Sequence, residues 1–167
     1  MTNIVCPHCG STNRAPEDRS PLDARCGKCG EPLFTSTPPD VSGQNLDRQI
    51  QRSSLPVLVD VWAPWCGPCR VMGPQFEAAA QEAQPALRFV KLNSDENQDM
   101  SARLGIRGIP TMLLFQDGKE VGRVSGAMSS RDILSWARGQ LAAHQALREP
   151  NIPLQNGSIQ LNKIALV

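Results

Sequence analysis

The sequence predicts a mixed α/β fold, in which a central sheet is flanked by helices and is preceded by a small module built around cysteines. Between residues 57 and 147, apolar runs typical of strands alternate with stretches that have helical spacing. Asp117-Gly118 lies between two apolar runs, which is typical of a hairpin. Four of the six cysteines form two C-x-x-C pairs within the first 29 residues, a segment too short to bury a core of its own.

The first predicted strand is the apolar run Val57–Trp62, which is typical of a strand buried on both faces. A helix should follow, because apolar residues recur behind the run at helical spacing, and Pro74 should kink that helix. These apolar residues are Met72, Phe76, Ala79, Ala80 and Ala83.

The second half of the domain continues the alternation. Residues 87–92 are predicted to form a second strand, and a short polar helix is expected at 97–104. Residues 111–115 lead through Asp117-Gly118 into 121–125, which predicts an antiparallel hairpin.

The last predicted helix should begin at Ser129 or Ser130, because serine side chains cap helix N-termini. Its apolar residues then share one face: Ile133, Ala137 and Leu141, with Leu134 beside them. Behind it, residues 148–167 contain two prolines and a glycine, and we expect a flexible tail. Docking of 159–167 as a strand is the alternative for this tail.

The tetrapeptide Cys66-Gly67-Pro68-Cys69 lies between the first strand and the helix. Two cysteines at this spacing can close a small disulfide, and a cysteine at a helix N-terminus has a lowered pKa. Pro68 near the helix start stiffens the turn. Thiol–disulfide exchange needs one thiolate to attack and a second thiol to resolve the mixed disulfide. We therefore expect Cys66 to attack and Cys69 to resolve, with only Cys66 exposed and acidic.

Asp60 lies in the middle of the first strand. Burial without a partner raises the pKa of a carboxyl group, so Asp60 should exchange protons near neutral pH. Asp60 then either transfers protons in the reaction or has a purely structural role.

The N-terminal cysteines have the spacing of a four-thiolate zinc site, with sixteen residues between the pairs. They are Cys6, Cys9, Cys26 and Cys29, and each pair is followed by a glycine that suits a tight knuckle, Gly10 and Gly30. One structural zinc contributes an apparent ~10–16 kcal/mol in finger-sized peptides, which would replace the missing core. A redox pair or two structural disulfides are the alternatives.

Taken alone, Cys6-Pro7-His8-Cys9 resembles the active-site tetrapeptide of periplasmic thiol oxidases. Its surroundings do not fit such a site, because no apolar strand is expected before Cys6 and no helix is expected after Cys9. We expect His8 to be exposed rather than to bind the metal.

The segment from Trp62 to Cys69, WAPWCGPC, resembles the active-site signature of the thioredoxins. The likeness extends over residues 41–146 and includes Asp60, Lys91-Leu92-Asn93, the run GIRGIPT at 105–111, and Ser125-Gly126-Ala127. With the cysteine pairs ahead of it, residues 1–147 resemble the thioredoxin-2 subgroup, which carries an N-terminal zinc-binding extension. The resemblance implies a thioredoxin fold preceded by a zinc-ribbon-like module.

The resemblance also implies the activity of a protein-disulfide reductase that an NADPH-dependent flavoprotein, thioredoxin reductase, resets. By the same resemblance, Gly67-Pro68 marks a reductant rather than an oxidase or isomerase. Asp60, with Lys91 and a water, would deprotonate Cys69, and Pro110 would be cis beside the cysteines. The residues that would bind the substrate are Trp65, Gly67, Pro68, Ile109, Gly126 and Ala127.

The predicted organisation is a zinc-ribbon-like module at 1–34, a linker at 35–42, a thioredoxin domain at 43–147 and the tail at 148–167. The first strand of the fold is hard to find, because Pro38-Pro39 favours an extended linker.

Charge argues against nucleic acid as a partner. The formal net charge is +1, and counting a zinc ion as +2 and four thiolates as −4 gives −1. The basic residues of the module are matched by acidic ones: Arg14, Arg19, Arg25 and Lys28 by Glu17, Asp18, Asp23 and Glu31.

The remaining expectations concern location and partners. No run approaches the length of a membrane span, and cysteines used for metal and exchange fit the reducing cytoplasm. We expect a monomer without an organic cofactor that acts on disulfide-containing client proteins. The alternative function is a redox-sensing zinc module that releases its metal on oxidation and changes partner binding.

Overall fold

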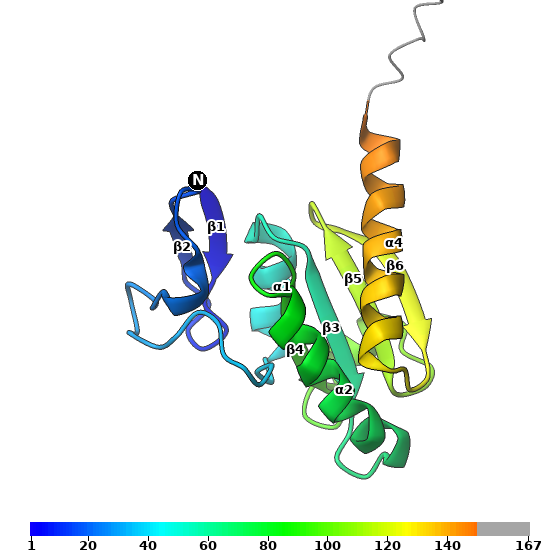
Figure 1. Cartoon of the computed structure of the whole chain (residues 1–167). Helices are drawn as coiled ribbons and strands as arrows, with labels where there is room; N and C mark the ends of the chain where they lie inside the picture. The colour runs from blue at the N-terminus through cyan, green and yellow to red at the C-terminus, as the bar shows by residue number, and fades with distance from the viewer. Residues whose placement is uncertain (150–167) are drawn as a thin grey trace, which may run out of the picture.

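The computed structural model describes residues 1–149, so the predicted tail beyond Glu149 lies outside the described residues. The described chain contains a two-stranded sheet in the N-terminal module and a four-stranded sheet in the order β4-β3-β5-β6. Figure 1 shows the N-terminal module beside the larger sheet, on the side of α1 and β4. Among the helices of this part of the chain, none has the length and apolar content that crossing a bilayer requires.

Strand β3 (Val57–Trp62) is the centre of the larger sheet and has the predicted bounds. It pairs in parallel with β4 (Arg88–Asn93) and antiparallel with β5 (Thr111–Gln116), and β6 (Lys119–Ser125) pairs with β5. All four strands occur where the sequence predicts strands, and a mixed sheet results.

The β5–β6 hairpin turns at Asp117 and Gly118, as predicted. The backbone φ angles are 54° at Asp117 and 76° at Gly118, so both residues occupy the left-handed region that a two-residue hairpin turn needs. Gln116 pairs with Lys119 across the turn.

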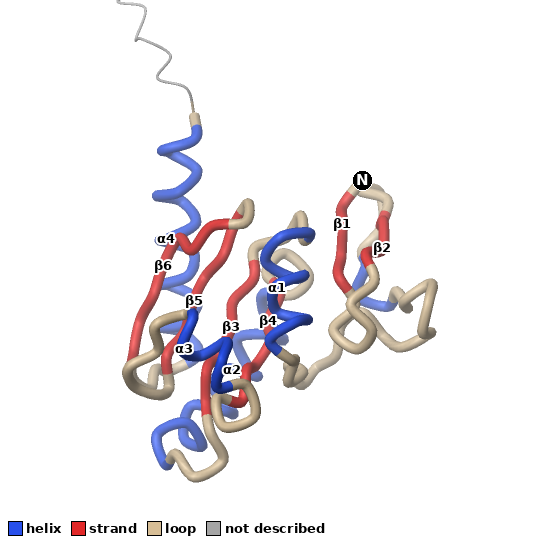
Figure 2. Tube along the Cα trace, turned by 180° about the vertical axis from the view of Figure 1, so that it is seen from behind, coloured by secondary structure: helices blue, strands red, loops and turns tan. Residues whose placement is uncertain are grey.

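Two helices cover each face of the sheet. On one face, α2 (Gly67–Ala83) and α4 (Ser130–Arg148) pack over Leu58 and its apolar neighbours. On the other face, α1 (Gly43–Arg52) and α3 (Gln98–Arg103) pack over the remaining side chains of β3 (Figure 2). These side chains follow the alternation of a strand, so Val57, Val59 and Val61 lie on the α1–α3 face.

Helices α2 and α4 occur where the sequence predicts them. Helix α2 continues through Pro74 to Ala83, so the proline lies inside the helix, and the kink expected there stays a prediction. The Ser129 side chain accepts a hydrogen bond from the Asp132 N–H, at 3.2 Å, which confirms the predicted cap of α4. Arg148, placed at the start of the predicted tail, is the last residue of this helix.

Helix α1 is not predicted by the apolar pattern. Its buried side chains are Asn45, Leu46 and Gln49, so two of the three are polar and no apolar stripe marks the helix. A local signal does exist, because the Ser42 hydroxyl accepts a hydrogen bond from the Asn45 N–H, at 3.1 Å.

The segment predicted as a linker runs along the edge of β4. The Lys91 N–H donates to the Pro39 carbonyl at 2.9 Å, and the Val41 N–H donates to the Lys91 carbonyl at 2.8 Å. Asp40 and Lys91 form a single parallel bridge. The first strand is therefore reduced to one bridge, which explains why the sequence pattern does not show it.

The N-terminal module corrects one expectation. Strand β1 (Thr2–Val5) directly precedes Cys6 and pairs antiparallel with β2 (Thr12–Ala15), so the statement that no strand precedes Cys6 is wrong. Strand β1 is only four residues long and begins with two polar residues, so it does not appear as an apolar run in the sequence. No helix directly follows Cys9, as predicted. A short 3₁₀ turn, Pro21–Asp23, lies farther along the module.

The module contacts the larger domain through polar side chains of α1. The Asn45 side-chain amide donates to the Cys6 carbonyl, and the Gln49 amide donates to the Val5 carbonyl, each at 3.0 Å. Both amides are buried, so α1 supplies the hydrogen bonds that the loop after β1 cannot obtain from water.

Replacement of Phe76 by alanine tests the α2 face of the core. Phe76 is fully buried on α2, and its ring meets Phe89 edge-on with centroids 5.1 Å apart. Phe76→Ala should lower the free energy of unfolding by about 3–5 kcal/mol in denaturant titrations. Val71, 70% exposed on the same helix, supplies the control. Equal stabilities of Phe76→Ala and Val71→Ala would contradict this packing.

Candidate functional site

Cys66 and Cys69 lie at the N-terminus of α2 and form a disulfide, with Cα atoms 5.2 Å apart. Cys66 is the N-cap residue of the helix, and the Cys69 N–H points at the Cys66 sulfur at 3.2 Å. Since β3 ends at Trp62, the strand delivers this pair to the helix start within four residues. The backbone therefore directs an unpaired N–H group and the positive end of the helix dipole at Cys66.

The exposure predicted for Cys66 is wrong in this oxidised form. Both cysteines are only 4% exposed. Cys66 packs with Ala63 and Cys69, and the partly buried side chains of Trp62 and Ile109 pack against this cluster. The chain around the pair is exposed instead, and Trp65 is 67% exposed, as expected for a residue beside the reactive sulfur.

Three segments distant in sequence meet at the disulfide. The Cys66 sulfur lies 3.7 Å from the carbonyl oxygen of Ile109. The Ile109–Pro110 peptide bond is cis, which confirms the prediction for Pro110. The Gly126 N–H donates to the Pro110 carbonyl at 2.9 Å, so Gly126 lies beside the cis proline. The structure thus brings Ile109, Pro110 and Gly126 to the cysteines.

Asp95 is a site residue that the sequence analysis missed. Its two carboxylate oxygens accept the indole N–H of Trp65 at 3.0 and 3.2 Å. Asp95 follows β4, and Trp65 follows β3; the carboxyl ends of parallel neighbours meet at one edge of the sheet. That rule, applied to the two predicted strands, would have placed Asp95 near Trp65.

Asp60 is completely buried in β3, and neither carboxyl oxygen has a hydrogen-bond partner among residues 1–149. Burial raises the pKa of Asp60 to about 7, with Asp40 acting in the same direction and Lys91 opposing it. This confirms the expected shift of the Asp60 pKa toward neutrality. Lys91 lies directly opposite Asp60 in the β3–β4 register.

The Lys91 side chain is positioned by an aromatic ring. Its ammonium group lies 4.2 Å from the centroid of the Trp62 ring, within the range of a cation–π contact. The Trp62 indole N–H donates in turn to Asp40 at 2.7 Å. Asp40 was not predicted as a site residue. It lies close to Trp62 because its segment pairs with β4 through a single bridge, which the sequence pattern does not show.

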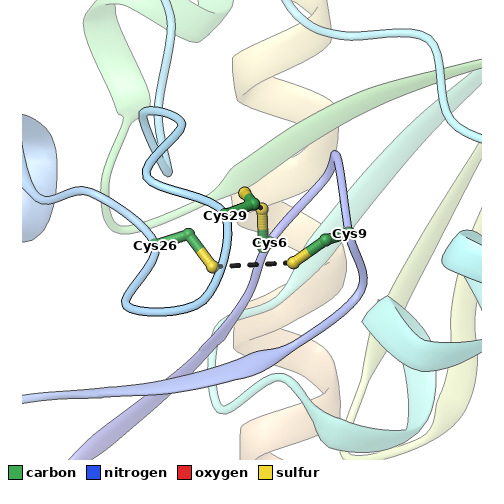
Figure 3. A group of neighbouring side chains, drawn as sticks. All are labelled: Cys6, Cys9, Cys26 and Cys29. Carbon is green, nitrogen blue, oxygen red and sulfur yellow. Dashed lines mark hydrogen bonds between the residues drawn. The ribbon is translucent and has the colours of Figure 1, made fainter.

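The four N-terminal cysteines converge from two loops, as Figure 3 shows. Their sulfurs all lie within 4.8 Å of one another, and Cys6–Cys29 and Cys9–Cys26 are each 3.6 Å apart. Four sulfurs about 2.3 Å from a central zinc would be roughly 3.8 Å apart, so the spacing fits one tetrahedral ion.

The backbone around the cysteines has the geometry of two metal knuckles. The N–H groups of Gly10 and Gly30 donate to the carbonyls of Cys6 and Cys26 at 2.9 Å, with φ angles of 76° and 79°. The N–H groups of the residues two positions after Cys6 and Cys26 point at these sulfurs at 3.4 Å. His8, the first of those residues, is exposed, as predicted.

The thiols of the cluster shift in both directions, because burial raises the pKa of Cys6 to about 12 whereas the pKa of Cys26 is lowered. Burial raises the pKa of the Cys26 thiol, but backbone N–H groups and the Asn13 side-chain amide outweigh it and lower the pKa to about 6. The Asn13 amide lies 3.5 Å from the Cys26 sulfur. A thiolate is the form of cysteine that binds metal, and the convergence of the four sulfurs fits a zinc ion.

Comparisons with known proteins agree with this geometry. Residues 38–139 match the thioredoxin family, and residues 5–31 match the family described as thioredoxin 2, N-terminal, a zinc ribbon. Thioredoxin C-3 of Corynebacterium nephridii is 39% identical over 142 residues, which cover 85% of this chain and 97% of that protein. A thioredoxin of Synechocystis sp. is 42% identical over 100 residues, which cover 60% of this chain and 94% of that protein.

Structure comparison gives the same family. The crystal structure of a thioredoxin of Malassezia sympodialis superposes with a TM-score of 0.57 at 28% identity, and the match covers 62% of this chain and 90% of that one. Together with the match of the N-terminal module, the four-cysteine cluster indicates one structural zinc. The chain therefore belongs to the thioredoxin family, as a thiol–disulfide oxidoreductase with the C-x-x-C pair Cys66–Cys69 and an N-terminal zinc ribbon.

Proposed function

We propose that this protein reduces disulfides in client proteins through Cys66 and Cys69, and that an NADPH-dependent thioredoxin reductase restores the dithiol. The placement of the Cys66 sulfur carries the proposal. This sulfur lies at the N-cap of α2, receives the Cys69 N–H and lies 3.7 Å from the Ile109 carbonyl. The helix N-terminus stabilises the thiolate that exchange requires.

The reaction proceeds in two exchange steps. The Cys66 thiolate attacks one sulfur of the client disulfide, forms a mixed disulfide and releases the other client sulfur as a thiolate. The Cys69 thiol then loses its proton, and its sulfur attacks Cys66 and releases the second client sulfur. Two electrons pass to the client, and the product is the Cys66–Cys69 disulfide present in this structure.

Asp60 is the base we assign to the second step, with Lys91 and a water. Asp60 lies on the same side of β3 as Leu58, since residues two apart share a face, and α2 covers that face. The carboxyl group is therefore directed toward the helix that carries Cys69. A pKa of about 7 suits a group that must accept and return a proton near neutral pH.

The exposed residues around the disulfide form the docking surface we propose for the client. An extended client segment would bind to the Ile109 backbone beside Pro110 and lie over Trp65 and the exposed Gly126. Added Cβ atoms at Gly67 and Gly126 would meet nothing within 4 Å, so this surface is open. Pro68 and Ala127, also exposed, complete the patch.

We place the protein in the cytoplasm, because six cysteines used for metal and exchange fit a reducing compartment, and we expect it to act as a monomer. Membership of the family implies client proteins and a reductase in general. The alternative function, a redox-sensing zinc module, stays a prediction, since no contact in residues 1–149 favours it over a structural ribbon.

Cys66→Ser tests the proposed function. The variant should lose nearly all NADPH-coupled reduction of a protein disulfide, because a serine hydroxyl does not form the attacking thiolate. The assay contains the full-length protein, thioredoxin reductase and an excess of the client, and it follows NADPH oxidation. Cys9→Ser is the matched control, since it removes a thiol from a C-x-x-C pair that we assign to the metal.

Cys9→Ser should retain turnover at a temperature where the variant is folded. Substantial turnover by Cys66→Ser, or its loss in a folded Cys9→Ser protein, would contradict the assignment of exchange to Cys66.

Asp60→Asn tests the buried acid through stability. The Asp60 pKa is about 7 in the folded protein and about 3.9 in an unfolded chain. Between these values the folded state holds more protons, so its stability falls as the pH rises from about 4 to 7. The gap between the two pKa values corresponds to a loss of about 4 kcal/mol.

Asp60→Asn removes this penalty, so the oxidised variant should match the wild type near pH 4 and exceed its stability above pH 7. Denaturant titrations at several pH values measure the difference. Asp18, which is exposed in the N-terminal module, provides the control variant Asp18→Asn. A constant difference between Asp60→Asn and the wild type from pH 4 to 8 would contradict the raised pKa.

A further inference from the structure

Arg88 is the most deeply buried charged side chain that the proposed reaction does not use. It is the first residue of β4 and is only 1% exposed. Its guanidinium group leaves the sheet edge and enters the N-terminal module, where it donates to the carbonyls of Val5 and Leu33. The bond to Val5 measures 2.9 Å. Arg88 thus joins the redox domain to both ends of the zinc ribbon.

The protein supplies this cation with no carboxylate. Within residues 1–149, Arg88 forms no ion pair, and its Nε has no hydrogen-bond acceptor. The other contact is with the Phe34 ring, whose centroid lies 4.3 Å from the guanidinium carbon. Burial lowers the pKa of Arg88 to about 10, so the group stays charged at neutral pH. A buried charge without an opposite charge is strongly destabilising.

The opposite charge lies in the metal site. Val5, whose carbonyl accepts the Arg88 bond, immediately precedes Cys6, one of the four metal ligands. A zinc ion with four thiolates carries a formal charge of −2. We propose that Arg88 is the counter-charge of the zinc–thiolate cluster and that it couples metal binding by the ribbon to the stability of the redox domain.

The coupling follows from the charges. With zinc bound, the negative cluster offsets the cost of burying the guanidinium, and Arg88 in turn favours the metal-bound form. Without zinc, the cluster no longer carries this fixed charge, and Arg88 loses its counter-charge. Because linkage is reciprocal, the factor by which Arg88 raises zinc affinity equals the factor by which zinc stabilises the docked arginine.

Zinc affinity of the reduced full-length protein gives the direct test. Competition against a chromophoric chelator, with a phosphine as reductant, should show one tightly bound zinc in the wild type. Arg88→Met should weaken zinc binding by at least about tenfold, a coupling of ordinary size between two sites. Arg14→Met removes an exposed arginine of the same ribbon and should leave the affinity nearly unchanged. Equal zinc affinity of Arg88→Met and wild type would overturn the proposal.

Arg88→Lys separates charge from hydrogen bonding. A lysine keeps the positive charge but cannot reproduce both bonds of the guanidinium. If the positive charge supports zinc binding, the zinc affinity of Arg88→Lys should lie closer to that of the wild type than to that of Arg88→Met. If Arg88→Met does not fold, Arg88→Lys carries the test against wild type, and a loss of zinc affinity of about tenfold or more would overturn the proposal.

Tryptophan fluorescence reports the coupling from the other domain, because Trp62, Trp65 and Trp136 all lie outside the ribbon. In the wild type, zinc should raise the midpoint of the unfolding transition seen by these residues. In Arg88→Met, saturating zinc should raise it by much less. An undiminished zinc-dependent shift in that variant would overturn the proposal, since metal would then stabilise the redox domain without Arg88.

Discussion

Strand β3 is paired on both sides and buried on both faces, and the arrangement of both functional sites depends on this position. Its carboxyl end leads directly into Cys66 at the start of α2, which aims helix N–H groups at the sulfur. Its middle holds Asp60 away from water, which raises the pKa of that carboxyl group. Its parallel neighbour β4 carries Lys91 opposite Asp60 and begins with Arg88, which donates to the Val5 carbonyl of the zinc ribbon.

The three C-x-x-C pairs have identical spacing but different chemistry, because the backbone around each pair differs. Cys66 and Cys69 lie on a helix start behind a buried strand, where their sulfurs meet each other. The pair at Cys6 is followed by a glycine turn, and its sulfurs face the sulfurs of a second, equivalent turn. The local turn after each pair therefore decides between exchange and metal binding.

Features with a local cause could be predicted from the sequence: the strand Val57–Trp62 from its apolar run, the hairpin from Asp117-Gly118 and the metal cluster from cysteine spacing. Features that arise from distant contacts could not. Helix α1 buries amides against the ribbon, so it lacks an apolar stripe. The burial of Cys66 depends on Ile109, 43 residues away, and no periodicity reports such a contact.

The central claim is that Cys66 alone attacks the client. Full-length Cys69→Ser, reduced and zinc-loaded, should accumulate a mixed disulfide with a disulfide-containing protein, since no second thiol is left to release it. Peptide mapping of the adduct by mass spectrometry then identifies the linked sulfur. The account predicts a single adduct at Cys66. An adduct at Cys6, Cys9, Cys26 or Cys29, or none at Cys66, would contradict it.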